Sequence, residues 1–250
     1  MGSIYNSSGQ RNLTSRCPVR QGGGILGPIA RARIHSMVAT SIIGVVLFCS
    51  AWDLTWWPAW AYMAVLVPGT ILPLAGPLRL DEGLIEERMS RKPDAKRWDR
   101  YFVASVGLFT MAELIVPGLD HRLKWSLPQP EWKHLLGLAF VIIGTLGLIW
   151  AMKVNRFFSA IIRIQQDRGH QVVDAGPYRI VRHPGYTFWS LRTFGVPLLL
   201  GSNPAFIVAV LFVAMFVVRT ILEDRVLQKE LTGYKEYAER VKWKLVKGVW

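Results

Sequence analysis

The stretch that decides how this chain is read is Gly176-Pro177-Tyr178-Arg179-Ile180-Val181-Arg182-His183-Pro184-Gly185-Tyr186. It carries two arginines, a histidine and two tyrosines between prolines and glycines, and an apolar segment, 187–201, follows at once. Because proline and glycine interrupt helices, the stretch predicts a rigid, cation-rich turn at the mouth of a membrane helix. Basic residues alone would orient that helix, so the tyrosines and the histidine indicate a site for an anionic cofactor tail rather than a passive anchor.

The rest of the chain has the composition of a membrane protein. Hydrophobic residues make up 51% of the sequence, and the mean hydropathy is +0.26. Apolar runs long enough for a helix to cross about 30 Å of hydrocarbon recur along it. We therefore predict an all-α, polytopic membrane helical bundle of about six transmembrane helices, at 36–52, 59–78, 101–117, 132–151, 186–201 and 204–221.

Two of these spans have unusual composition. The span 59–78 contains Pro68, Pro73 and Pro77, so we expect a kinked or broken helix. The break could open a lateral entrance for lipid, or it could simply make the helix pack unevenly. In the span 132–151, three glycines fall near one helical face and predict a close approach of a neighbouring helix, a packing role that requires no catalytic function: Gly137, Gly144 and Gly147.

The formal net charge is +13, and the basic residues that cause it are clustered in segments between the predicted spans. Lysine and arginine number five in 1–35, seven in 79–100, six in 152–185 and eight in 219–250, whereas few lie between these segments. This alternation predicts six crossings with both termini cytoplasmic and the segment 120–131 outside. The positive charge then meets anionic membrane lipids, and no basic module outside the membrane pattern indicates nucleic-acid binding.

The sequence divides into three parts. Residues 1–33 lack acidic residues and are rich in Gly, Ser and Arg, which predicts a disordered basic arm. Residues 34–151 hold the N-terminal transmembrane helices, and 152–250 form the C-terminal cofactor-binding and catalytic region with the last helical hairpin. The two cysteines, Cys17 and Cys49, build neither a disulfide framework nor a metal site, and we expect no metal.

Two charged segments connect the spans. Residues 79–100 mix both signs of charge and predict a solvated helix and loop with local ion pairs. Residues 153–168 alternate apolar and basic side chains, which predicts an amphipathic helix. That helix could lie in the membrane interface, extend the preceding span into the cytoplasm, or guide a lipid substrate inward.

The C-terminal motifs resemble one known family. Gly176-Pro177-Tyr178, Val181-Arg182-His183-Pro184 with Tyr186, Glu223-Asp224 with Leu227, and Gly233-Tyr234 with Tyr237 occur in an order and spacing similar to those of the isoprenylcysteine carboxyl methyltransferase family. The resemblance covers about residues 168–240. The chain departs from the family pattern at Phe188, where glycine is usual, and at Asp224, where a second glutamate is usual.

The resemblance implies an integral-membrane methyltransferase that uses S-adenosylmethionine and acts on a lipophilic acceptor. Arg182 and His183 would meet the cofactor carboxylate, and Glu223 or Asp224 its ammonium or ribose. Tyr178 and Tyr186 would supply aromatic walls. The full set implied for the cofactor is His170, Gly176, Pro177, Tyr178, Arg182, His183, Tyr186, Glu223 and Asp224; for catalysis we expect Arg182, Glu223 and Arg192.

Two ionisable residues fall at membrane depth. Glu113 lies toward the outer end of 101–117, and Arg192 lies within 186–201. Such groups are costly in a membrane and usually face a cavity or a partner. Arg192 is the better functional candidate because it follows the 176–186 turn by two helical turns, although a structural ion pair or snorkelling would also explain it.

The sequence does not identify the group that accepts the methyl. If the nucleophile is a carboxylate, such as that of an isoprenylcysteine-like group, charge is annihilated in the transition state and a dry site favours reaction. An amine or a thiol would first lose a proton, with His183 or Glu223 as the candidate base. Phospholipid N-methylation, small-thiol S-methylation, an NADPH-dependent reductase of the sterol type, and a non-catalytic scaffold are the alternatives.

Overall fold

The computed structural model describes residues 26–89 and 97–250, and within them every regular element is helical. Six long helices and two short ones follow one another, with 3₁₀ turns between some of them. They are α1 (Pro28–Ala51), α2 (Trp57–Ile71), η1 (Leu72–Leu74), η2 (Gly76–Leu78), α3 (Glu82–Met89), α4 (Arg97–Leu123), α5 (Glu131–Val154), η3 (Gln166–Arg168), η4 (Gly176–Arg179), α6 (Pro184–Leu200), α7 (Pro204–Glu230) and α8 (Tyr234–Arg240).

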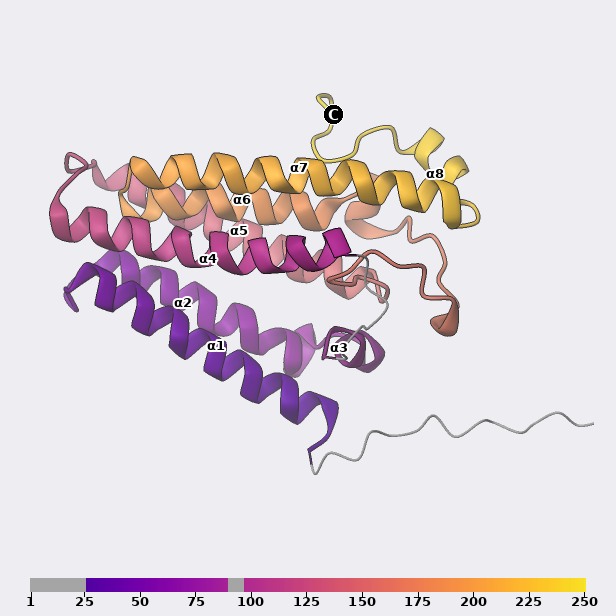
Figure 1. The fold of residues 1–250 in the computed structure, drawn as a ribbon, viewed down its shortest axis with the longest axis horizontal. Helices are drawn as coiled ribbons and strands as arrows, with labels where there is room; N and C mark the ends of the chain where they lie inside the picture. The colour runs from indigo at the N-terminus through magenta and orange to yellow at the C-terminus, as the bar shows by residue number, and fades with distance from the viewer. Residues whose placement is uncertain (1–25, 90–96) are drawn as a thin grey trace, which may run out of the picture.

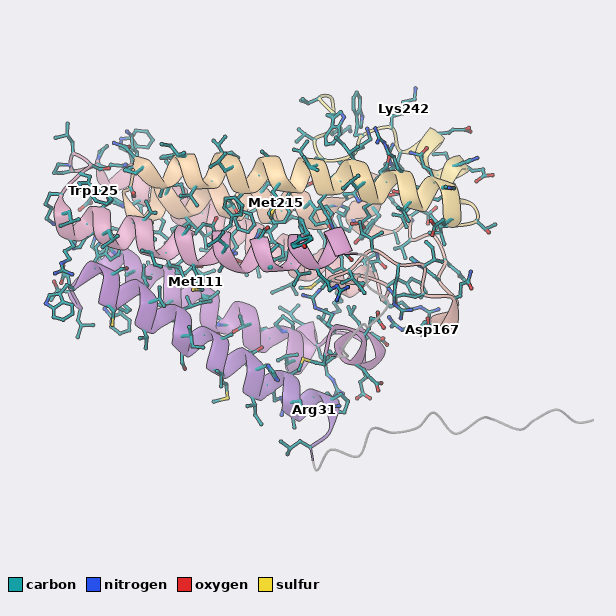
Figure 2. All side chains as sticks on the ribbon, viewed as in Figure 1. Arg31, Met111, Trp125, Asp167, Met215 and Lys242 are labelled. Atoms are coloured by element: carbon teal, nitrogen blue, oxygen red, sulfur yellow. The ribbon has the colours of Figure 1, made fainter. Side chains whose placement is uncertain are left out.

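The six long helices run side by side as a bundle (Figure 1). Helix α6 packs most extensively on α5 and also contacts α7, while α4 joins α1 to α7. The loops after α1, α4 and α6 gather at one end of the bundle, where Trp125 is labelled in Figure 2. Helices α3 and α8 and the irregular 155–183 segment lie at the opposite end, so the candidate site residues are collected there.

Within the described residues, five helices are long and apolar enough to cross a membrane: α1, α2 extended through η1, α4, α5 and α7. These confirm the all-α, polytopic bundle. The sixth predicted span, 186–201, is the helix α6, whose 17 residues reach about 25 Å at 1.5 Å per residue. That length falls short of about 30 Å of hydrocarbon, so α6 could cross only with little tilt and with local thinning.

The prolines of the second span break its helix as predicted. Helix α2 ends at Ile71, and two 3₁₀ turns follow at η1 and η2, each with proline in its first turn. The first helix, in contrast, begins earlier than expected: α1 starts at Pro28, so residues 28–33 of the predicted basic arm are helical. The segment 1–25 of that arm lies outside the described residues.

Glycines allow α5 and α6 to approach closely, as predicted. A side chain added at Gly137 would overlap the backbone of α6 at Leu199, and one added at Gly144 would crowd Arg192. A methyl group at Gly147 would overlap the ring of Phe188. The bulky residue at the position where the resembled family has glycine is therefore accommodated by a glycine on the facing helix.

The predicted amphipathic helix at 153–168 is wrong. Helix α5 ends at Val154, and the chain is irregular until the 3₁₀ turn η3. The side chain of Asn155 accepts a hydrogen bond from the backbone N–H of Phe157 at 2.9 Å, and that of Ser159 accepts one from Ile161 at 3.3 Å. Such local bonds compete with helical ones, and here they turn the chain back over the end of the bundle.

Candidate functional site

The turn 176–186 enters α6 through an unusual backbone. Gly176 has φ of +55°, a conformation that favours glycine, and its position is crowded by Val154 and Trp150 of α5. Pro184 stands in the first turn of α6, where its missing N–H costs nothing. The backbone N–H groups of Arg182 and His183 donate to the carbonyls of Trp243 and Lys244 at 2.9 Å each. The C-terminal segment therefore holds the turn in place.

The side chain of Arg182 is committed to structural partners. Its Nε and Nη2 donate to the two carboxylate oxygens of Asp224 at 2.8 and 3.0 Å. Its Nη1 donates to the carbonyls of Val241 and Lys242 at 2.8 and 3.0 Å. The residue is only 7% exposed. The guanidinium thus ties the turn to α7 and to the C-terminal segment at once.

Asp224 is the centre of this buried network. Besides Arg182, it accepts a hydrogen bond from the Tyr234 hydroxyl at 3.1 Å and one from the Gln228 amide at 2.8 Å. The Nε2 atom of His183 lies 3.2 Å from the same carboxylate, which fixes the orientation of the imidazole ring. The carboxylate is 2% exposed, and its hydrogen-bond partners come from three segments of the chain: the 176–186 turn, α7 and α8.

Glu223, the neighbouring residue, points differently. One of its oxygens accepts a hydrogen bond from the Tyr186 hydroxyl at 2.7 Å, and that hydroxyl accepts one from the Nε of Arg219 at 3.2 Å. Arg219 is itself 1% exposed; it pairs with Asp99 at the start of α4 and donates to the carbonyl of Ala160 at 3.0 Å. A chain of hydrogen bonds therefore runs from α4 through α7 and α6 to the Glu223 carboxylate.

These residues border a cavity between the irregular segment and the ends of α6 and α7. One side presents Glu223 with the rings of His183 and Tyr186; the other presents aromatic and apolar side chains of 155–163. The full lining is Asn155, Phe157, Phe158, Ser159, Ile161, Ile162, Arg163, His170, Tyr178, His183, Gly185, Tyr186, Glu223 and Leu227. The cavity therefore combines a carboxylate, two imidazoles and several aromatic faces.

Burial and charge set the protonation of two cavity groups that lie in loops. Burial, reinforced by the positive charges of Arg163 and Arg168, lowers the pKa of His170, so this imidazole is neutral near pH 7. Burial also raises the pKa of the Tyr178 hydroxyl, which is hydrogen-bonded to the Asn155 amide at 3.2 Å. Both groups therefore meet a ligand in their neutral forms.

The cavity brings together part of the site set derived from the sequence. Five of the residues line it: His170, Tyr178, His183, Tyr186 and Glu223. Four others do not line it and lie behind it: Gly176 and Pro177 shape the turn, while Arg182 and Asp224 form the buried pair. Helical geometry explains why the consecutive acidic residues diverge, since neighbouring side chains on a helix point about 100° apart.

Arg192 lies outside the cavity. Its Nη2 donates to the Tyr62 hydroxyl at 2.6 Å, and its guanidinium stands 5.8 Å from the centre of that ring. Glu113 of α4 is 2% exposed and so also lies inside the bundle. The geometry therefore gives Arg192 partners within the bundle, two helical turns away from the groups that line the cavity.

Sequence reasoning missed several residues of the site. Asn155 and Phe157 line the cavity because the chain leaves the helix there, and the Asn-Arg-Phe-Phe sequence after α5 was the available signal for that turn. Asp99 was missed altogether. It pairs with Arg219 and accepts the N–H of Ile162 at 2.8 Å, yet it stands in a mixed-charge segment where no pattern sets it apart.

Comparisons with known proteins match the part of the chain that contains this cavity. Residues 132–232 match the family model described as phospholipid methyltransferase. A probable protein-S-isoprenylcysteine O-methyltransferase of Oryza sativa subsp. indica is 29% identical over 131 residues, which are 49% of this chain and 68% of that protein. Protein-S-isoprenylcysteine O-methyltransferases B and A of Arabidopsis thaliana are 33% and 28% identical over 121 and 119 residues, each match covering 46% of this chain and 60% of the relative.

The matched region holds α5, α6, α7 and the 155–183 segment, and so every residue that lines the cavity. These matches confirm the resemblance to the isoprenylcysteine carboxyl methyltransferase family and the expectation of a methyltransferase with several membrane-spanning helices.

Proposed function

We propose that the protein transfers a methyl group from S-adenosylmethionine to a lipophilic acceptor, in the cavity bounded by 155–163, α6 and α7. The observation that carries the proposal is the meeting of Glu223, Tyr186 and His183 in one cavity at the end of the membrane helices. A carboxylate beside aromatic faces suits a ligand with a cationic centre, because both attract positive charge. The matched family supplies the reaction class.

The cavity side chains fit the polar groups of this methyl donor. Glu223 accepts from Tyr186 through one oxygen, which leaves the other for the donor's ammonium or ribose hydroxyls. His170, His183 and Arg163 provide nitrogen atoms for its carboxylate. Tyr178 and Tyr186 offer ring faces for the adenine or the sulfonium. When bound, the donor would supply an electrophilic methyl group.

The protein's part in the reaction is alignment and exclusion of water. Methyl transfer requires the acceptor atom in line with the methyl group, and a rigid cavity provides most of the acceleration by holding that geometry. Arg219 fixes the Tyr186 hydroxyl, which in turn fixes Glu223, so the carboxylate is oriented before a ligand binds. Asp224 orients His183 in the same way.

The irregular segment 155–163 has to move for this to happen. The cavity volume is about 80 Å³, whereas small-molecule sites typically enclose about 300–1,000 Å³. The two faces of the cavity belong to this segment and to the ends of α6 and α7. We expect the segment to open for entry of the donor and then to close over it, which excludes water from the reacting groups.

A carboxylate is the favoured acceptor group, by analogy with the isoprenylcysteine O-methyltransferases among the relatives. Amine or thiol acceptors stay as the second candidate, because the family model is that of phospholipid methyltransferases. We further propose that α6 completes six crossings, with both termini cytoplasmic. The arrangement of the loops after α1, α4 and α6 at one end supports this topology (Figure 1).

Calorimetric titration of the detergent-purified protein with S-adenosylhomocysteine and, separately, with NADPH tests the proposal. We expect S-adenosylhomocysteine to bind and NADPH not to bind, and we expect Glu223→Gln to weaken the binding. Binding of NADPH alone would replace the proposal with a membrane reductase. Binding of neither would favour a non-catalytic scaffold.

A further inference from the structure

A second hollow lies at the end of the bundle opposite the candidate site, the end at which Trp125 is labelled in Figure 2. Its volume is about 620 Å³, and its lining comes from the α1–α2 loop, the end of α4, the loop that follows, the start of α5 and the end of α6. We call it the loop-end hollow, and the argument uses five of its lining residues: Asp53, Trp56, Asp120, Lys124 and Gln129. Helix α5, whose 24 residues reach about 36 Å, runs from this hollow to the cavity of the candidate site.

Exposed tryptophans surround this end of the bundle. Four of them are 46–75% exposed: Trp52, Trp57, Trp125 and Trp132. Tryptophan is enriched where membrane proteins cross the boundary between hydrocarbon and water. The hollow therefore lies at the depth of the lipid head groups, in the membrane leaflet opposite the candidate site.

Asp120 is a buried carboxylate of the loop-end hollow. It is 2% exposed, and its two oxygens accept hydrogen bonds from the backbone N–H and the hydroxyl of Ser126 at 2.7 and 2.6 Å. Each oxygen keeps a lone pair for a further donor. Among residues 26–89 and 97–250, no cation pairs with Asp120; the neighbouring His121 is paired with Asp53 at 2.8 Å. Because a charge buried without a counter-ion is unfavourable, a positively charged ligand would stabilise this site.

A second polar group of the hollow lacks a partner. The side-chain oxygen of Gln129 is shielded from solvent and accepts no hydrogen bond within the described residues. The nitrogen of the same amide donates to the side-chain oxygen of Asn203 at 3.4 Å. Since buried acceptors in native proteins nearly always have a donor, the oxygen indicates a ligand that carries N–H groups.

Asp53 and Trp56 add a second negative charge and an aromatic face. Hydrogen bonds from Thr55 and His121 lower the pKa of the Asp53 carboxyl to about 2, so the group is ionised near pH 7. The ring of Trp56 is 6% exposed and stacks on that of His121, with 4.4 Å between the ring centres. Carboxylates and indole rings both attract ammonium ions, so the hollow favours a cationic group.

The surroundings of this cation site match the rest of a phospholipid. Lys124 also lines the hollow, is exposed, and forms no ion pair with any described residue, so it is available to a phosphate. A mostly apolar groove of about 540 Å³ along the end of α1 shares Asp53 with the hollow. Two of the side chains that line this groove, Val45 and Leu54, are 62% and 70% exposed. Such a surface suits a hydrocarbon chain.

We propose that the loop-end hollow binds the head group of a phospholipid with a primary ammonium group. The ammonium meets Asp120, Gln129 and the Trp56 ring, the phosphate meets Lys124, and one hydrocarbon chain follows the groove on α1. A primary ammonium is favoured over a quaternary one because the two oxygen acceptors require N–H donors. The bound lipid joins the loops after α1 and α4 and stabilises the fold. Since the hollow is a helix length away from the candidate site, this lipid is not the methyl acceptor, and the proposal does not depend on the proposed function.

Native mass spectrometry of the full chain in detergent, titrated with dioleoyl phosphatidylethanolamine, phosphatidylcholine or phosphatidylglycerol, tests the proposal. Phosphatidylethanolamine should bind more tightly than phosphatidylcholine. Asp120→Asn removes the charge while its amide can still bond to Ser126, and it should weaken the binding of phosphatidylethanolamine about ten- to hundredfold. It should not weaken the binding of phosphatidylglycerol, which has no ammonium group. Lys124→Gln should have a smaller effect, because an exposed charge is screened by water.

Matched variants separate these effects from general ones. Glu131→Gln and Lys133→Gln remove the same two charges at the start of α5, at the same end of the bundle but outside the hollow. Both should bind phosphatidylethanolamine as the wild type does. Gln129→Met keeps the length of the side chain, removes the unpaired acceptor without a change of charge, and should weaken binding about three- to tenfold. Thermal unfolding without added lipid reports whether each variant folds, and Gln129→Met decides the test if Asp120→Asn does not.

Three results would overturn the proposal. The first is that neither Asp120→Asn nor Gln129→Met loses affinity, or that the control variants lose as much. The second is that all three lipids bind with equal affinity. The third is that soluble O-phosphoethanolamine displaces the lipid at equal concentration, which would make the ligand a free amine. Binding of S-adenosylhomocysteine should be unchanged in every variant, because none of the substituted residues lines the cavity of the candidate site, so a failure of the proposed function is measured separately.

Discussion

The guanidinium of Arg182 forms a two-point ion pair with the carboxylate of Asp224, at 2.8 and 3.0 Å, and both side chains are buried behind the cavity rather than within it. The arginine of the Arg-His-Pro turn is thus a positioning residue. It holds His183 and the C-terminal segment in register, and the residue next to its partner, Glu223, is the one that faces the cavity.

Replacing Arg182 with alanine should therefore act on stability first. The change leaves the Asp224 carboxylate buried without its main partner, a loss of about 3–5 kcal/mol in the free energy of unfolding. Thermal unfolding of the detergent-purified protein measures it, and the Arg182→Ala, Asp224→Asn double variant should recover part of the loss. Arg179→Ala, at an exposed position, is the control. A stable Arg182→Ala protein that fails only in binding S-adenosylhomocysteine would instead place Arg182 on the ligand.

Glu223→Gln should weaken ligand binding and leave the stability of the fold unchanged. The amide oxygen can still accept from the Tyr186 hydroxyl, so folding should be unchanged, while the negative charge in the cavity is lost. Hydrogen bonds to charged groups contribute about 1.5–3 kcal/mol, which predicts about ten- to hundredfold weaker binding of S-adenosylhomocysteine by calorimetry. Asp224→Asn should lower the unfolding temperature instead. Unchanged ligand affinity in a well-folded Glu223→Gln protein would remove Glu223 from the site.

The difference between these two carboxylates shows how far the sequence could lead. Spacing along the chain places the 176–186 turn and Glu223-Asp224 at neighbouring helix ends, and the apolar runs predict the spans that contain them. Which of two adjacent acidic residues faces the cavity depends on the rotation of α7 in the bundle, and that rotation is set by packing. The Arg182–Asp224 pair joins residues 42 positions apart, and its existence follows from the same packing.

The irregular conformation of 155–163 could not be predicted from the sequence, for a different reason. Its alternation of apolar and basic residues is compatible with an amphipathic helix, and the competing signal is short: the hydrogen bonds of Asn155 and Ser159 to nearby backbone N–H groups. These bonds prevail because Asp99 and Arg219, from distant parts of the chain, bind Ile162 and Ala160 and hold the segment in its irregular form.

The membrane topology can be tested with single cysteines in a background lacking Cys17 and Cys49. Leu127 is 83% exposed in the loop after α4, and Asp174 is exposed in the segment before η4, at the other end of the bundle. A membrane-impermeant thiol reagent should label Leu127→Cys in intact cells and Asp174→Cys only after permeabilisation. The reverse pattern would invert the orientation, and labelling of both in intact cells would mean that α5, which separates the two positions, does not cross the membrane.

His170, the half-buried histidine of the cavity, predicts a pH dependence of stability. Because burial and the charges of Arg163 and Arg168 lower the pKa of His170, the unfolded chain takes up a proton there at higher pH than the folded one. Above the usual histidine pKa of about 6.5, both states are neutral at this residue and the free energy of unfolding is not reduced. As the pH decreases below that value, protonation favours the unfolded chain and the free energy of unfolding falls. His170→Gln should make the unfolding temperature less sensitive to pH between about 5 and 7. The exposed His35→Gln should leave the wild-type profile unchanged.

The contact between Gly147 and Phe188 allows a test by rescue. A methyl group at Gly147 would overlap the Phe188 ring, and α5 and α6 are too closely packed to separate without loss elsewhere, since Gly137 and Gly144 meet the backbone of α6 directly. Gly147→Ala should therefore destabilise the protein by about 1–3 kcal/mol, the usual cost of overpacking. Phe188→Ala alone leaves a gap and should also destabilise it. In the double variant the methyl group can occupy part of the space of the lost ring, so its unfolding temperature in detergent should exceed the value expected if the two losses simply added. If the two losses of stability simply add, the ring of Phe188 does not limit the approach of the two helices. Gly147 would then not explain how a bulky residue is accommodated at position 188.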